Sequence, residues 1–211
     1  YLDTGGLFRT YAYGLSRDGI LPEQLTTAKA IVDRYDVQLT LAGQEGFFLN
    51  GENVSQAIRE NHMSQLASDY SKHPAVREAV LILERQLAKN HAVVMDGRDI
   101  GSVVLPEAPF KVFLTADLAE RANRRHDELL AKGKNIAYED IYKDIAQRDH
   151  QDQTRAVAPL VRVPDAFYLD TTSLDFEEVI DALLDYLQQK GQELQWAEVV
   201  KRVEEARTHE S

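Results

Sequence analysis

The sequence predicts an α/β fold in which helices cover both faces of a mostly parallel sheet. Apolar segments typical of buried strands alternate along the chain with amphipathic segments of helical spacing, and parallel sheets are built from this order. The clearest strand is the apolar run 92–95, which opens directly into the polar loop 96–99. Residues 36–71 interrupt the order with a period-two pattern, which indicates a small antiparallel insertion.

Composition limits the class of protein. A chain of 211 residues allows one domain with an insertion, or two small domains. The formal net charge of −11 argues against a nucleic-acid partner, because non-specific binding depends on Lys and Arg that neutralise phosphates. The sequence holds no cysteine, no signal segment and no apolar run that could span a bilayer. We therefore expect a cytoplasmic protein that works without disulfides and without a membrane.

The first residues predict the end of a strand, a turn and a helix. Asp3 or Thr4 can cap this helix. One helix face carries apolar side chains at a spacing of four, namely Leu7, Tyr11 and Leu15. Arg9 lies in the first turns, and its spacing alone is compatible both with a solvated helix arginine and with one that binds an anion.

The insertion follows. The alternation at 37–41 and the apolar residues 47–49, separated by the turn residues 43–46, predict a β-hairpin. The helices expected around it cover 23–35, 62–70 and 74–88.

The loop after the run 92–95 is the strongest candidate for a ligand site. In open α/β sheets, ligands bind outside the carboxyl ends of the strands. Asp96, Arg98 and Asp99 follow such an end directly, and their groups could hold a cation, sugar hydroxyls, a base edge or a phosphate. The alternative is a helix cap with a local Asp–Arg pair, because Asp and Gly are ordinary turn residues.

Two further strands are predicted over 110–115 and 166–172. Arg121 and Arg125 lie four apart on the helix after the first of them, where like charges repel. Either a polyphosphate lies between the two guanidinium groups or acidic neighbours neutralise them. The candidate neighbours are Asp117, which can also cap this helix, Glu120 and Glu128.

Arginines and a carboxylate also share a face near residue 150. Arg148, Asp152 and Arg155 are spaced by four and three, so they share a helix face, which suits a solvated ladder of ion pairs. The helices expected in this half of the chain cover the segment from 117 to Gly133, then 135–145, 176–188 and 194–207, with a break at Gly191.

One motif resembles a known family. Residues 96–106, Asp-Gly-Arg-Asp-Ile-Gly-Ser-Val-Val-Leu-Pro, closely resemble the DGRD-(M/I)-G-T-V-V-x-P segment of bacterial cytidylate kinases. Other segments resemble that family in the same order, from Tyr1 to about Leu187. The resemblance implies a P-loop NTPase-like parallel sheet covered by helices on both faces, with a small antiparallel NMP-binding insert and a helical lid. The implied parts are a core over 1–35 and 74–190, an insert over 36–73 and a lid over about 132–158. A helical tail over 191–211 goes beyond the family pattern and either packs on the body or is a partner helix.

The resemblance also implies roles for the acceptor nucleotide. Residues 3–9 resemble the family's D-(S/T)-G-A-x-Y-R, so Arg9 would bind the acceptor phosphate and Asp3 would lie near the ribose; Gly6 and Phe8 depart from the usual Ala and Tyr. The groups that would contact the cytosine ring are Ser68, Arg77 and Asp99. Without the resemblance, Ser68 and Arg77 would pass for ordinary surface residues.

Residues 148–155 resemble the family's lid segment R-D-x-x-D-x-x-R. Arg148 and Asp152 would contact the ribose and phosphate of the substrate, and Arg155 would lie on the phosphates in transfer, so Arg148 and Arg155 are catalytic candidates. Four further roles are implied. Arg98 would clamp a phosphate or hold its loop, Asp96 would be a catalytic group near Mg²⁺, bound through water, and Arg121 and Arg125 would bind ATP.

The function implied by the resemblance is phosphoryl transfer from ATP to CMP or dCMP by a monomer that uses Mg²⁺. The sequence contains no G-x-x-x-x-G-K-(S/T) loop, with which such kinases cradle the donor phosphates. In the family that loop precedes the Asp3-Thr4-Gly5 segment, so we expect that a strand, the loop and part of a helix are missing before Tyr1. A non-catalytic nucleotide-binding chain and another small-molecule kinase of the same fold remain as alternatives.

Overall fold

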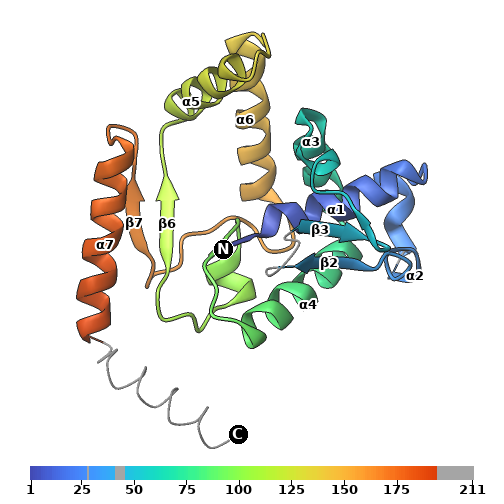
Figure 1. Ribbon diagram of the computed structural model, residues 1–211, viewed down its shortest axis with the longest axis horizontal. Helices are drawn as coiled ribbons and strands as arrows, with labels where there is room; N and C mark the ends of the chain where they lie inside the picture. The colour runs from blue at the N-terminus through green and yellow to red at the C-terminus, as the bar shows by residue number, and fades with distance from the viewer. Residues whose placement is uncertain (28, 41–45, 194–211) are drawn as a thin grey trace, which may run out of the picture.

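The computed structural model describes residues 1–27, 29–40 and 46–193 (Figure 1). The chain forms a mixed α/β structure with small parallel and antiparallel sheets. In the described ranges, no helix combines the length and the apolar character needed to cross a membrane. The predicted tail helix over 194–207 and the turn residues 43–45 lie outside the described residues.

The amino-terminal segment forms as predicted. Strand β1 (Leu2–Asp3) runs directly into helix α1 (Thr4–Arg17), and the Asp3 carboxylate accepts a hydrogen bond from the backbone N–H of Gly6 at 3.1 Å. This bond satisfies one of the free N–H groups in the first helical turn. The helix predicted over 23–35 is wrong in detail: the segment divides into a 3-10 turn, η1 (Pro22–Thr27), and a short helix, α2 (Lys29–Val32).

The predicted hairpin is confirmed. Strand β2 (Val37–Thr40) pairs antiparallel with β3 (Gly46–Leu49), and β3 pairs with β4 (Glu52–Asn53). Asn50 and Gly51 connect β3 to β4, both with positive φ (51° and 82°), as a tight hairpin turn requires. The short turn η2 (Ala57–Arg59) and the helices α3 (Asn61–Tyr70) and α4 (Pro74–Asn90) follow.

The hairpin packs against α1, α3 and α4 around the main hydrophobic core. The largest fully buried side chains include Leu7 and Leu15 of α1, Leu49 of β3 and Val80 of α4. The insert and the helices beside it therefore share one continuous core. A smaller core of Ala122, Leu129 and Ile141 joins α5 (Leu118–Ala131) to α6 (Tyr138–Thr154).

The predicted single parallel sheet is not formed by the described residues. Strand β5 (Met95–Asp96) pairs only with β1, and β6 (Val112–Thr115) pairs only with β7 (Phe167–Asp170), both in parallel. The run 92–95 was expected to be a buried strand, but only its last residue belongs to β5 and Val94 is 71% exposed, because β1 is its only neighbour. Val112 and Leu114 of β6 are also exposed, so helices do not cover both faces here.

Two features of the later helices differ from expectation. A five-residue π-helix, η3 (Ile100–Val104), follows the polar loop directly, and no spacing in the sequence predicts it. Helix α7 (Phe176–Glu193) continues through Gly191, which was expected to break it. Tyr186 of α7 stacks on Phe167 of β7 with 4.6 Å between ring centroids, and this contact holds the helix beside the β6–β7 pair (Figure 1). As predicted, α5 ends just before Gly133, which has a φ of 71°.

Candidate functional site

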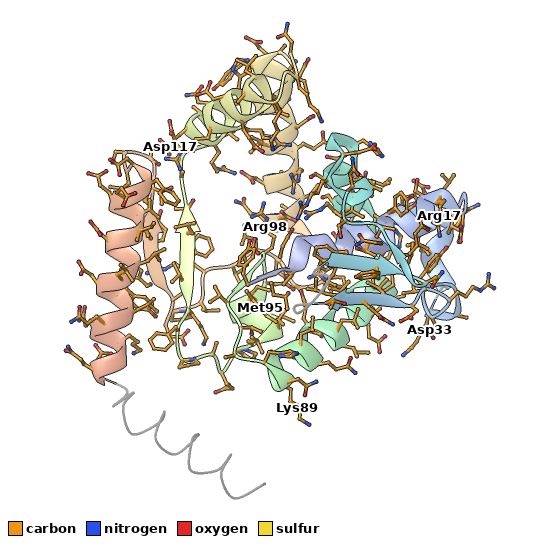
Figure 2. All side chains as sticks on the ribbon, viewed as in Figure 1. Arg17, Asp33, Lys89, Met95, Arg98 and Asp117 are labelled. Carbon is orange, nitrogen blue, oxygen red and sulfur yellow. The ribbon has the colours of Figure 1, made fainter. Side chains whose placement is uncertain are left out.

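The parallel pairing of β1 with β5 creates the site. Asp3 and Asp96 are register partners at the carboxyl ends of these strands, so the start of α1 and the loop 96–99 lie together. The Thr4 hydroxyl donates a hydrogen bond to the backbone carbonyl of Asp96 at 2.8 Å and fixes the loop to the helix. Figure 2 shows Arg98 of this loop between β5 and the lower end of α6.

A ladder of ion pairs extends from α4 through the loop to α6. Arg77 donates to Asp99 at 2.5 Å, and the side chains of both are less than 10% exposed. Arg155 lies 3.5 Å from Asp99 and 3.2 Å from Asp152, and Arg98 donates to Asp152 at 3.0 Å. Every member was predicted from the sequence, and the structure connects them. All of these side chains except Arg98 are less than 10% exposed, so loss of one partner would leave another buried charge uncompensated. The Arg98 side chain is 47% exposed.

The end of α6 is held in an unusual conformation by the same ladder. The helix stops at Thr154, so Arg155 is the first extended residue rather than part of the predicted helix face. Its Nε donates to the carbonyl of Ala158 at 2.6 Å. Ala158 has a φ of 50°, which is uncommon for a residue with a side chain. Strain of this kind collects at functional sites.

Two arginines beside the ladder each have a buried N–H group for which the described residues supply no hydrogen-bond acceptor. Arg9 forms an ion pair with Asp3 at 2.5 Å, yet its buried Nε has no hydrogen-bond partner among the described residues. The buried Nε of Arg148 also lacks a partner in the described part of the chain. Burial, followed by the charge of Arg98, lowers the pKa of Arg148. Buried N–H groups almost always find an acceptor, so this place suits an anion.

Ser68 reaches the site from α3. Its hydroxyl donates to the side-chain oxygen of Gln151 on α6 at 2.8 Å. One turn further along, the Ser71 carbonyl accepts from Arg77 at 3.4 Å, so Ser68 lies close to the Arg77–Asp99 pair. Sequence reasoning did not find Gln151, because an amide one position before Asp152 carries no signal of its own.

Asp96 offers an accessible carboxylate at the rim. One of its oxygens accepts from the Tyr1 hydroxyl at 2.8 Å, and the residue is otherwise exposed. The described residues contain no cluster of three or more metal-ligating side chains. Mg²⁺ is commonly held by one or two carboxylates together with water and substrate phosphates, so a single exposed carboxylate beside an anion site fits that ion.

The arginines of α5 form a separate group with their own partners. Arg121 makes a bidentate pair with Asp149 of α6 at 2.6 and 3.1 Å, and Arg125 pairs with Glu128 at 2.6 Å. Glu128 was among the expected neutralising residues, whereas Asp149 was missed because only the packing of α5 on α6 places it there. Asp117, at the start of α5, makes no capping hydrogen bond with its side chain. It lies far from Arg98 in Figure 2.

The comparison with known proteins decides the family. The sequence profile described as cytidylate kinase matches residues 1–189. The chain belongs to the cytidylate kinase family. It is 40% identical to the cytidylate kinase of Bacillus subtilis (strain 168) over 193 residues, which cover 90% of this chain and 86% of that protein. It is also 41% identical to the cytidylate kinase of Anoxybacillus flavithermus over 192 residues and 38% identical to that of Fervidobacterium nodosum over 190 residues; each match covers 90% of this chain and 85% of the relative. The resemblance found in the sequence is confirmed, and with it the enzyme class, a nucleoside monophosphate kinase.

Proposed function

We propose that this chain binds CMP or dCMP at the Arg77–Asp99 ladder and takes part in phosphoryl transfer to it from ATP. Family membership supports the reaction. The observation that carries the site is the pair of buried guanidinium donors beside the loop 96–99, on Arg9 and Arg148, for which the described residues supply no acceptor. A phosphate group is the anion that this reaction would bring there.

The acceptor phosphate would lie among the arginines. Arg9 comes from α1, Arg98 from the loop and Arg148 from α6, so a phosphate between them would join three elements. Asp3 holds Arg9 at 2.5 Å and Asp152 holds Arg98 at 3.0 Å. Guanidinium groups suit phosphate because they present several donors in one plane.

The cytosine ring would lie against Arg77, Asp99 and Ser68. Its exocyclic amino group donates hydrogen bonds, while its carbonyl oxygen and ring nitrogen accept them. A carboxylate, a guanidinium and a hydroxyl can satisfy that set. The ion pair between Arg77 and Asp99 fixes the first two groups in advance, which reduces the cost of ordering them when a nucleotide binds.

The chemistry requires positioning rather than a covalent intermediate. A phosphate oxygen of CMP attacks the γ-phosphorus of ATP, a new P–O bond forms, and the bond to the ADP oxygen breaks. Arg148 and Arg155 would neutralise the charge that spreads over the transferred group. Mg²⁺, when bound, would balance donor-phosphate charge, and Asp96 would hold it through water. Closure of α6 over the site would exclude water and so suppress hydrolysis of ATP.

The finer architecture is also a proposal. The family implies a P-loop nucleoside monophosphate kinase fold, in which residues 36–73 would be the NMP-binding insert and about 132–158 the lid. The pairs β1–β5 and β6–β7 would then be parts of one parallel sheet. Arg121 and Arg125 are proposed as donor-nucleotide contacts. The donor-phosphate loop is assigned to no residue of this sequence.

Two measurements test the proposal. Titration of the 211-residue chain with CMP tests the acceptor site by itself, and a coupled assay of ADP release with ATP and CMP tests transfer. Arg148→Met should weaken CMP binding at least tenfold. Arg17→Met is the matched control, because Arg17 lies exposed at the far end of α1 (Figure 2) and should leave binding unchanged. Absence of CMP binding by the wild-type chain would refute the proposal.

The base contacts have their own test. Asp99→Asn keeps the size of the side chain but exchanges one acceptor for a donor, so the preference for CMP over UMP should fall at least tenfold. Unchanged discrimination would remove Asp99 from base recognition. CMP binding without release of ADP would indicate a non-catalytic nucleotide-binding protein.

A further inference from the structure

Glu84 is an enclosed carboxyl group directly behind the proposed base site. It lies on α4 seven residues after Arg77, which places both side chains on the same helix face. The residue is only 3% exposed. It forms no ion pair with any residue that the structure describes, although buried carboxylates are rarely left without one.

The charged groups around Glu84 already have other partners. Arg77 and Arg85 come from its own helix, and Asp99 comes from the loop. Arg77 is directed at Asp99, with 2.5 Å between donor and acceptor. Arg85 donates to two backbone carbonyls of η3 at 2.9 and 3.2 Å. An ionised Glu84 would therefore lie beside a second carboxylate, and neither guanidinium is directed at it.

The remaining polar group that acts on the Glu84 carboxyl is the hydroxyl of Thr4 on α1. That hydroxyl has a single hydrogen, and it is donated to the carbonyl of Asp96 at 2.8 Å. The hydroxyl is also pressed against the loop, because a Cβ atom on Gly97 would lie only 2.5 Å from its oxygen. A bond between Glu84 and Thr4 must then take its hydrogen from Glu84, and only the acid form has one.

We propose that Glu84 is a positioning residue that acts as a neutral carboxylic acid, donating to Thr4 and leaving Arg77 to Asp99. The role rests on the function proposed above, which assigns the cytosine ring to Arg77 and Asp99. Burial, followed by the charge of Asp99, raises the pKa of Glu84 to about 8, while Arg77, the hydroxyl of Thr4 and then Arg85 oppose the shift. At neutral pH the acid form prevails. Above pH 8 the new carboxylate competes with Asp99 for Arg77 and draws the Thr4 hydrogen away from the loop.

Glu84→Gln tests this role, because the amide has nearly the same shape, can donate to Thr4 and stays uncharged at every pH. CMP affinity is measured by calorimetry from pH 6.5 to 9 on the 211-residue chain. Wild-type affinity should fall about tenfold by pH 9, since only about one molecule in eleven then holds the proton and affinity scales with the competent fraction. The variant should bind within about threefold of wild type at pH 6.5 and keep that affinity at pH 9. Other titrating groups are common to both proteins.

Parallel pH profiles for the two proteins would overturn the proposal, as would a tenfold loss of affinity in the variant at pH 6.5. Glu84→Leu removes the donor to Thr4 and should weaken CMP binding at pH 6.5 at least fivefold; unchanged binding would also count against the role. A carboxyl titration by ¹³C NMR on ligand-free wild-type protein needs no variant and no CMP. Ionisation of Glu84 below pH 6 would overturn the proposal. If wild-type chain binds no CMP, the proposed function fails, while the NMR titration still decides the state of Glu84.

Discussion

Replacement of Gly6 by Ala should destabilise this protein, although glycine is normally the poorer residue inside a helix. Gly6 lies buried in the first turns of α1. A Cβ atom there would lie 2.1 Å from the tip of the Phe47 ring and 2.5 and 2.7 Å from its flanking carbons. Phe47 is itself 6% exposed on β3, so its ring cannot move aside without shifting the hairpin.

Two opposing effects set the size of the change. Ala stabilises a helix interior by about 1 kcal/mol relative to Gly. Forcing an extra methyl group into a packed core costs about 1–3 kcal/mol, and a contact near 2 Å with a buried ring falls at the upper end of that range. We therefore expect Gly6→Ala to lower the free energy of unfolding by about 1–2 kcal/mol.

A double-mutant cycle measured by urea unfolding separates these effects. Phe47→Leu alone should destabilise, because it removes buried ring atoms. In the double variant the smaller Leu makes room for the methyl group, so the loss should be at least 1 kcal/mol smaller than the sum of the single losses. The reasoning fails if Gly6→Ala is as stable as wild type, or if the two losses simply add.

Three further outcomes follow from the charged groups of the site. The pKa of Glu84 is higher in the folded protein, about 8, than its ordinary value of 4.5, so its contribution to stability is fully present below pH 4.5 and is lost as pH rises to 8. Relative to Glu84→Gln, wild type should therefore lose up to about 1.4 kcal/mol of its free energy of unfolding per pH unit in this window. If urea unfolding gives the same difference in stability between the two proteins at pH 5 and at pH 8, this reasoning is contradicted. Arg148→Met removes a buried donor that has no acceptor among the described residues, so it should raise the free energy of unfolding by about 1 kcal/mol while lowering kcat at least a hundredfold; a less stable variant would show that Arg148 has partners in the folded protein. Arg77→Met leaves Asp99, among the described residues, with only the longer 3.5 Å ion pair to Arg155 and should cost about 3–5 kcal/mol; a loss below 1 kcal/mol in the same assay would show that the pair is well solvated.

Local patterns in the sequence predicted most of the elements. The Asp3 cap, the β2–β3 hairpin and the end of α5 at Gly133 each depend on residues close together in the chain, and the structure contains all three. The polar loop after 92–95 was predicted to lie at the carboxyl end of a strand, and its Asp96 is register partner to Asp3. The DGRD motif, together with the other matching segments in the same order, led to the correct family.

The tertiary structure decided which charged groups meet. The bond between Ser68 and Gln151 and the pair of Arg121 with Asp149 join elements far apart in the chain, and no local spacing predicts which surfaces of two helices will touch. The π-helix η3 and the continuation of α7 through Gly191 also differ from the local pattern, because packing against neighbouring elements can outweigh the propensity of one residue. Glu84 is the clearest case. In the sequence it is an ordinary helix glutamate, and only the packing of α1, α4 and the loop 96–99 buries its carboxyl group and so raises its pKa.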